Sequence, residues 1–172
     1  MQNKSTQEFD DIIRNIIENQ KVQEMKKYKQ HYETSTFDHC YMVSYYCYKV
    51  CKKLKLDYKS AARAGMLHDF FLYDWRIKNG RKGLHAFTHG KTACKNASEL
   101  FELSEKEKDM IIKHMWPVTP QFPKSKEGFI LTFIDKHCAL AEAMKVLKKN
   151  IHKKESLEIC LHIFINDYFK NK

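Results

Sequence analysis

The sequence is organised around a short helical stretch that ends in a His-Asp pair, Ala61-Ala62-Arg63-Ala64-Gly65-Met66-Leu67-His68-Asp69. Its small residues and His68 follow the i, i+3, i+4, i+7 spacing of one helix face. Alanine and glycine on that face allow a second helix to come close, so His68 is expected to point into packed surroundings. Asp69 follows about 100° further around the helix. An imidazole beside a carboxylate suits a divalent transition metal, and the remaining ligands must come from elsewhere in the chain.

The composition predicts a helical protein. With 172 residues, of which 43% are hydrophobic and 30% charged, the chain can bury the core of one globular domain. Its 5 glycines and 3 prolines are too few for the many turns of an all-β fold. All three prolines fall in one rigid loop, at Pro117, Pro120 and Pro123. We therefore predict an all-α, single-domain helical bundle.

We expect one domain over residues 1–172, because no repeat, low-complexity segment or boundary interrupts the chain. Its central part, about residues 36–145, carries the motifs described below. An N-terminal helix is predicted within residues 1–35. A basic, solvated turn at residues 145–154 is predicted to separate the central part from a C-terminal amphipathic helix at residues 154–170.

The chain is strongly basic, with 31 Lys and Arg against 21 Asp and Glu, a net charge of +10. Such a surface favours nucleotides, nucleic acid or anionic lipid as partners, although these lysines also fit a plain solvated surface. No apolar run reaches transmembrane length, and the N-terminus has no apolar leader. We therefore expect a cytoplasmic chain without membrane contact, whose six cysteines stay reduced rather than form disulfides.

Further His and Asp residues fall on the inward faces of other predicted helices, namely His39, His89, His114 and Asp135. His85 precedes His89 by four residues, so spacing alone allows either histidine to bind a metal. A single inward histidine is more often an ordinary core residue than a ligand. Asp135 ends an apolar run, and burying it requires a cation or a metal unless it turns to solvent. Together, five helices that each carry such a group can bring them to one point in a bundle core.

The order of these residues resembles that of the HD-domain metal-dependent phosphohydrolase superfamily, over about residues 36–145. The family order is His, then His-Asp, then a distal Asp, with two further histidines in the two-metal members. In this chain the order is filled by His39, His68-Asp69, His89, His114 and Asp135. The spacing is most similar to small bacterial members that cleave dinucleoside polyphosphates. Phe70-Phe71 replaces the Ile-Gly that often follows the doublet. The sequence has no Gly-Tyr-Pro element like that of cyclic-di-GMP phosphodiesterases, which argues against that substrate.

The resemblance implies an enzyme that hydrolyses a phosphate ester or anhydride, of a nucleotide or dinucleotide, with metal-activated water. It implies two divalent transition metals, which the mixed N/O ligands leave open among Fe, Mn, Co, Ni and Zn. One metal would take His39, His68, Asp69 and Asp135. The second would take His89 and His114 and share Asp69 as the ligand that bridges to the metal-bound water. Cations that could neutralise substrate phosphate, or simply lie at the surface, are Arg76, Lys91, Lys113 and Lys136.

Three alternatives stay open at this point. Some HD proteins with a similar ligand set are mixed-valence di-iron oxygenases, so the chemistry is either hydrolysis or oxygenation. A non-catalytic nucleic-acid-binding module would use the +10 charge, but phosphate contacts need no inward His/Asp set. The basic loop at residues 76–83 is either a mobile flap over an anionic substrate or an ordinary solvated loop.

Overall fold

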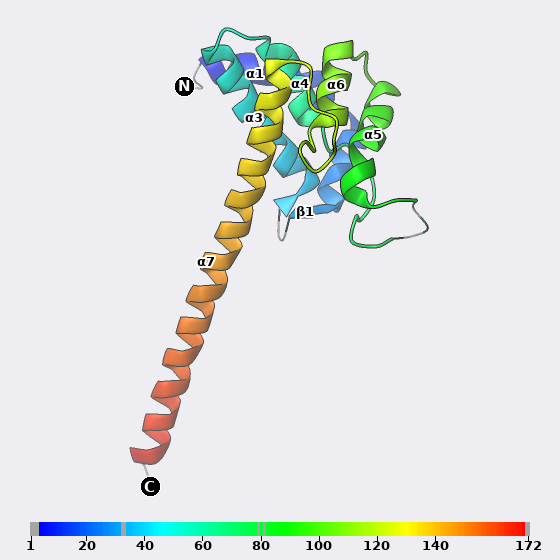
Figure 1. The fold of residues 1–172 in the computed structure, drawn as a ribbon. Helices are drawn as coiled ribbons and strands as arrows, with labels where there is room; N and C mark the ends of the chain where they lie inside the picture. The colour runs from blue at the N-terminus through cyan, green and yellow to red at the C-terminus, as the bar shows by residue number, and fades with distance from the viewer. Residues whose placement is uncertain (1–3, 32–33, 79, 81, 171–172) are drawn as a thin grey trace.

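The predicted all-α fold is confirmed in a computed structural model, which describes residues 4–31, 34–78, 80 and 82–170. The helices and strands are α1 (Lys4–Ile17), α2 (Gln20–Gln23), the 3₁₀ helix η1 (Glu24–Lys27), β1 (Lys29–His31), β2 (Thr34–Ser35), α3 (Thr36–Lys53), α4 (Tyr58–Leu67), α5 (His85–Ser98), α6 (Glu105–Lys113) and α7 (Lys126–Lys170). The two strands pair as a short antiparallel hairpin. Helices α1 to α6 gather into one body, against which the first turns of α7 pack (Figure 1).

Side chains fix the starts of the helices that build the site. Ser35 accepts a hydrogen bond from the backbone N–H of Asp38 at the start of α3. Asp57 does the same for Ser60 at the start of α4. At α6, Ser104 and Glu107 cap each other's backbone N–H groups. Each cap satisfies a backbone donor that the first turn of a helix leaves without a partner, and so sets where the helix begins.

Glycines permit the two closest helix contacts near the site. A Cβ on Gly65 would lie 2.8 Å from the Cα of Ser44, so α4 approaches the backbone of α3. A Cβ on Gly90 would lie 2.9 Å from the carbonyl oxygen of Ile112, so α5 lies equally close to α6. The close approach expected for the small-residue face of α4 is therefore present, and a second one joins α5 to α6.

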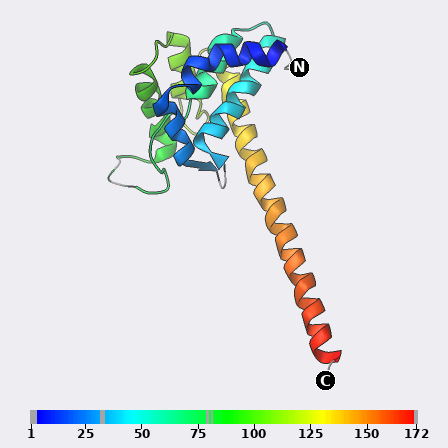
Figure 2. The same cartoon turned by 180° about the vertical axis from the view of Figure 1, so that it is seen from behind.

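One boundary predicted from the sequence is wrong. No turn occurs at residues 145–154, because α7 continues to Lys170 and projects far from the body (Figures 1 and 2). The segment contains no glycine or proline, and its lysines and leucine favour helix, so it carries no strong signal that would end a helix. The N-terminal helix predicted within residues 1–35 is α1, and the described residues between α1 and α3 form two short helical turns and the hairpin. No helix within the described ranges is long and apolar enough to cross a membrane.

Five of the six cysteines have described side chains, which are buried and form no disulfide; they are Cys40, Cys47, Cys51, Cys94 and Cys138. They pack as small apolar residues in the core, as the sequence predicted.

Candidate metal centre

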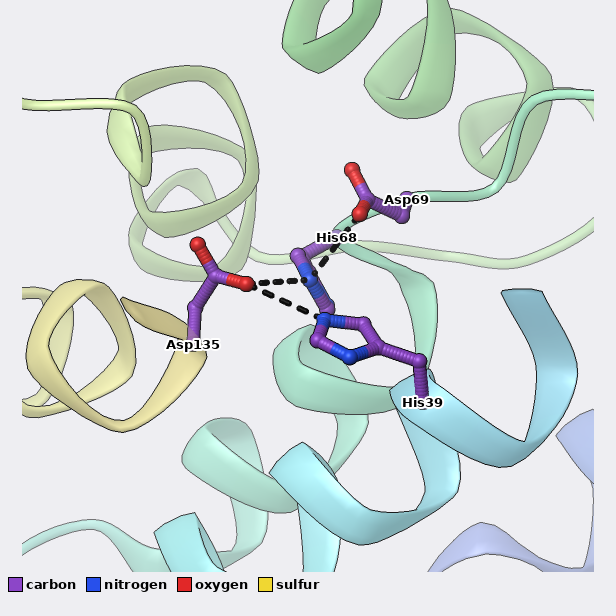
Figure 3. A group of neighbouring side chains, drawn as sticks. All are labelled: His39, His68, Asp69 and Asp135. Atoms are coloured by element: carbon purple, nitrogen blue, oxygen red, sulfur yellow. Dashed lines mark hydrogen bonds and ion pairs between the residues drawn. The ribbon is translucent and has the colours of Figure 1, made fainter. Parts of the chain in front are cut away.

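The structure brings together the side chains of all six His and Asp residues selected from the sequence. They form two buried groups that could each hold a metal ion and that share Asp69. The first group is His39, His68, Asp69 and Asp135, and the second is Asp69, His89 and His114. Figure 3 shows the first group, in which side chains from α3, from the end of α4 and from α7 point toward one another. Elements far apart in sequence therefore meet at one point in the core.

Asp135 joins the two histidines of the first group. Its Oδ1 lies 3.1 Å from Nε2 of His39 and 3.5 Å from Nε2 of His68. The same His68 nitrogen lies 3.3 Å from Oδ2 of Asp69 (Figure 3). The possible ligand atoms of this group are thus two imidazole nitrogens and two carboxylate oxygens, which all lie within 4.8 Å of one another.

The second group uses the other oxygen of Asp69. Oδ1 lies 3.2 Å from Nε2 of His89 and 3.5 Å from Nε2 of His114. The two Nε2 atoms lie only 2.8 Å apart, because Gly90 lets α5 and α6 approach. His89 is the fifth residue of α5 rather than part of its first turn, and His114 is the residue that ends α6.

Every imidazole in the centre is oriented by its Nδ1 atom. Nδ1 of His68, His89 and His114 lies 2.7–2.8 Å from the backbone oxygens of Gly65, His85 and Ile111, respectively. Nδ1 of His39 lies 3.1 Å from Oε1 of Glu142. Carbonyl and carboxylate oxygens only accept, so Nδ1 carries the hydrogen and a neutral ring presents a lone pair at Nε2.

The fit to a metal follows from this orientation. Four Nε2 atoms face two carboxylates and one another, so with neutral rings only acceptors meet at the centre, and they require either protons or a metal cation between them. Nε2 of His68 and Oδ1 of Asp69 are buried and lack a well-aligned hydrogen-bond partner in the described part of the chain. Such atoms require a partner in a dry core, and a divalent ion supplies one. The residues present therefore fit a metal.

The electrostatics of the centre favour cations. Burial opposes ionisation of Asp69, but the imidazoles of His68 and His89 outweigh it and hold its pKa well below the usual range. Burial likewise opposes the charge on His39, yet hydrogen bonds to Asp135 and Glu142 raise its pKa to about 10. His114 differs, because burial is its largest influence and lowers its pKa to about 3. The centre thus keeps its carboxylates ionised and attracts positive charge.

Two residues that support the centre were not selected from the sequence. Glu142 is 4% exposed and orients His39 from two turns further along α7 than Asp135. Gln30, on β1, donates from its side-chain amide to Oδ2 of Asp69. The seven-residue spacing from Asp135 to Glu142 places both on one helix face, a signal that could have found Glu142. No comparable pattern marks Gln30, since its strand has only three residues.

A cavity of about 260 Å³ opens beside both groups. It is lined by Gln30, Asp69, Trp75, His85, Ala86, His89, His114, Met115, Val118, Asp135, Lys136 and Ala139. His85, which spacing alone left open as a ligand, belongs to this lining and to neither ligand group. The cavity opens onto all three residues of the second group and onto Asp135 of the first.

Of the four predicted phosphate-binding cations, only Lys136 lines this cavity. Its Nζ donates to the backbone oxygen of His114 at 3.0 Å. Arg76 instead pairs with Asp74, and Lys113 pairs with Asp109. Lys91 is exposed on α5. In the basic loop, Lys78 and Lys82 are exposed, whereas Arg81 lies outside the described residues, so the flap stays a prediction.

Comparison with known proteins gives no match to a family model, a curated protein or a solved structure. The description of this protein therefore rests on its own fold and on the residues of its candidate metal centre. It is an all-α protein with a buried His/Asp cluster that could hold metal ions. That arrangement is compatible with an HD-type site.

Proposed function

We propose that this protein is an HD-type metal-dependent hydrolase that cleaves a phosphate ester or anhydride of a nucleotide. The observation that carries the proposal is the convergence of four Nε2 lone pairs and two carboxylates beside an open cavity. The order of these ligands along the chain is the order of the HD superfamily. The basic charge of +10 is consistent with an anionic substrate.

Each residue of the centre has a defined part in this proposal. His39, His68, Asp69 and Asp135 would hold one metal, and His89, His114 and Asp69 would hold the other. Bound there, two divalent ions would supply an activated water and would offset charge on the phosphoryl oxygens. Asp69 joins the two groups through its two oxygens, and Gln30 fixes the orientation of its carboxylate. Lys136 places a positive charge at the cavity wall.

A substrate panel tests the proposed activity. Phosphomonoesters, cyclic nucleotides, dinucleoside polyphosphates and an aryl phosphodiester would each be offered to protein loaded with Fe, Mn, Co, Ni or Zn. We expect release of phosphate or of a nucleotide, and loss of this release in Asp69→Asn. Arg76→Gln serves as the matched control, because Arg76 is exposed and outside the cavity. If no phosphorus compound is cleaved with any of these metals, the proposal is wrong.

The proposed metal count has its own test. Protein reconstituted without oxygen should bind about two equivalents of metal, one for each group of ligands. His89→Ala combined with His114→Ala should reduce this to about one and remove most hydrolysis, since only the first group remains complete. Circular dichroism would check that the chain stays folded. A parent protein that saturates at one equivalent would contradict the two-metal proposal.

One observation favours oxygenation as the second candidate. Within the described residues, the cavity lining beyond the ligands contains a single cation, Lys136, and several apolar side chains. A cavity wall with one cation and several apolar side chains also suits a substrate with little charge, such as the small polyols that would be offered to an oxygenase. Di-iron protein would therefore be mixed with small polyols and phosphonates in air, and oxygen consumption would be recorded. Substrate-dependent oxygen uptake, without anaerobic hydrolysis of nucleotides, would select this candidate over the hydrolase.

A further inference from the structure

Trp75 and His85 form an aromatic wall at the mouth of the cavity, and their packing is specific. The two rings stack at 5.5 Å between centroids with 20° between planes, and His85 stacks on His89 at 4.4 Å and 21°. The indole Nε1 of Trp75 donates to the backbone oxygen of Gln30 at 3.1 Å. The hydrogen bond to Gln30 therefore holds Trp75 in place, and at the other end of the wall His85 contacts His89, a candidate metal ligand.

The position of Trp75 is not explained by core packing. The indole is 37% exposed and follows the Phe71-Leu72-Tyr73 segment, where Phe71 is fully buried. Large aromatic side chains bind planar apolar groups through area and ring stacking, and they lose little conformational entropy in doing so. A partly exposed, rigidly held tryptophan at the mouth of a cavity is thus suited to contact a bound molecule.

Other parts of the lining are also apolar. Met115 and Val118 follow the end of α6, and Ala139 lies on α7. Val118 is 49% exposed although it is a large apolar residue. Together with the Trp75–His85 wall, these side chains give the cavity an apolar character, while the ligands of the candidate metal centre form its polar part. A substrate that fits has a charged end and an apolar end.

Charge and size limit this substrate further. Lys136 is the single cation among the described lining residues, and its Nζ already lies 3.8 Å from Oδ2 of Asp135. Beyond the phosphoryl group held at the metal centre, a polyphosphate chain would bring further negative charges, for which this lining offers only Lys136. The cavity of about 260 Å³ is also smaller than the roughly 300–1,000 Å³ typical of sites for drug-sized ligands.

We propose that the Trp75–His85 wall is a specificity site for a compact, planar apolar group, and that the substrate is a small ester carrying a single phosphoryl group. The phosphoryl group lies at the metal centre and the planar group against the wall. This inference rests on the proposed hydrolase function. It narrows the substrate from nucleotides and dinucleotides in general to monophosphates.

Binding of phosphonates, which resist hydrolysis, tests the wall directly. Titration calorimetry on the metal-loaded full chain would compare phenylphosphonate with methylphosphonate. We expect the phenyl compound to bind more tightly, by about 2- to 10-fold, from ring stacking. Trp75→Ala should remove this preference, measured as the ratio of the two dissociation constants within the same variant. Trp75→Leu keeps an apolar side chain and should lose only part of the preference. This variant distinguishes the loss of ring stacking from a folding defect that Trp75→Ala could cause.

Trp116→Phe is the matched control, because Trp116 packs on Phe129 at 5.7 Å and does not line the cavity. It should keep the full preference for the phenyl compound. Equal binding of both phosphonates by the parent protein would overturn the inference about the Trp75–His85 wall. An unchanged preference in both Trp75 variants would do the same. Either result would leave the hydrolase proposal standing. Tighter binding of methylenebisphosphonate than of phenylphosphonate overturns the single-phosphoryl assignment. If neither monophosphonate binds, the single-phosphoryl assignment is overturned, whereas the hydrolase proposal fails only if the substrate panel also shows no cleavage.

Discussion

The four imidazoles of the candidate metal centre differ in the atom that orients each ring. Three of them donate Nδ1–H to a backbone carbonyl oxygen, whereas His39 donates to the carboxylate of Glu142. A carboxylate partner makes the ring a more basic ligand than a carbonyl partner does. The first group therefore has a stronger set of donors than the second, and Glu142 is the residue that causes the difference.

Glu142→Gln should weaken metal binding at the first group. The amide oxygen can still accept from Nδ1 of His39, but the negative charge of the Glu142 carboxylate is lost. Loss of such a partner of a metal ligand typically lowers metal affinity by about 10- to 100-fold. Competition with a chromogenic chelator would measure both dissociation constants. Glu105→Gln is the matched control, because its side chain is 90% exposed. Equal weakening of both sites, or of neither, would contradict this role.

Single residues also show how far the sequence could predict the site. The six ligand candidates were found because each interrupts an apolar or small-residue face, and a helix repeats its faces regularly. Gln30 and the Trp75–His85 wall were missed, because a three-residue strand and an irregular loop have no such period. Arg76 and Lys113 were selected for their charge alone, and each is paired with a neighbouring Asp outside the cavity.

At the scale of helices, the contact between α5 and α6 should not tolerate a side chain at Gly90. A Cβ there would meet two backbone oxygens, at 2.9 and 3.0 Å, and backbone cannot rotate away as a side chain can. We expect Gly90→Ala to lower the free energy of unfolding by about 1–3 kcal/mol, although alanine favours helix. Chemical denaturation would measure this, with the exposed Lys91→Ala as control.

Gly90→Ala should also weaken metal binding at the candidate metal centre. Separation of α5 from α6 moves His89 away from His114, so the second group should lose metal affinity before the first. A Gly90→Ala protein with parental stability and parental affinity at both sites would show that the two helices can adjust without cost.

Asp57, which caps α4, links the stability of that helix to pH. Burial opposes its ionisation, but hydrogen bonds from Ser60 and the ion pair with Lys106 outweigh it and lower its pKa. A lowered pKa stabilises the fold above the pKa of the unfolded chain, about 3.9, and this stabilisation is lost as the pH falls through the folded value. Asp57→Ala should therefore cost about 1 kcal/mol at pH 7 and less at acid pH. Denaturation from pH 7 to pH 3 would test this, and Asp57→Asn should keep the cap but lose the pH dependence.

Helix starts were more predictable than helix ends. Asp57 and Ser104 cap α4 and α6, and such starts can be read from a sequence because a cap is a local hydrogen bond between residues three apart. The end of α7 had no such local signal. Lysines at residues 145–154 suggested a solvated turn, yet exposed lysines are equally suited to the surface of a long helix.

For the whole molecule, the candidate metal centre ties together helices α3, α4, α5, α6 and α7. A ligand that binds only the folded chain stabilises it, by about 2.7 kcal/mol at a concentration 100 times its dissociation constant. Metal-loaded protein should therefore unfold at a higher temperature than protein dialysed against a chelator. His39→Ala combined with Asp135→Ala should lose most of the increase, because the first group is then broken. An equal melting temperature with and without metal would indicate that the helices do not depend on the centre.

The orientation of the four rings also predicts that metal binding releases protons from the core. With each Nδ1–H already committed, an Nε2 that touches a carboxylate in metal-free protein does so by holding a second proton. Burial opposes this second proton, but the neighbouring carboxylates favour it: they raise the pKa of His39 to about 10 and also raise the pKa values of His68 and His89. An incoming metal must displace those protons, so its uptake should acidify an unbuffered solution and should grow stronger with rising pH. Calorimetric heats of loading should then differ between buffers of unequal ionisation enthalpy, by an amount proportional to the protons released. Identical heats in both buffers would mean that the rings were neutral before the metal arrived.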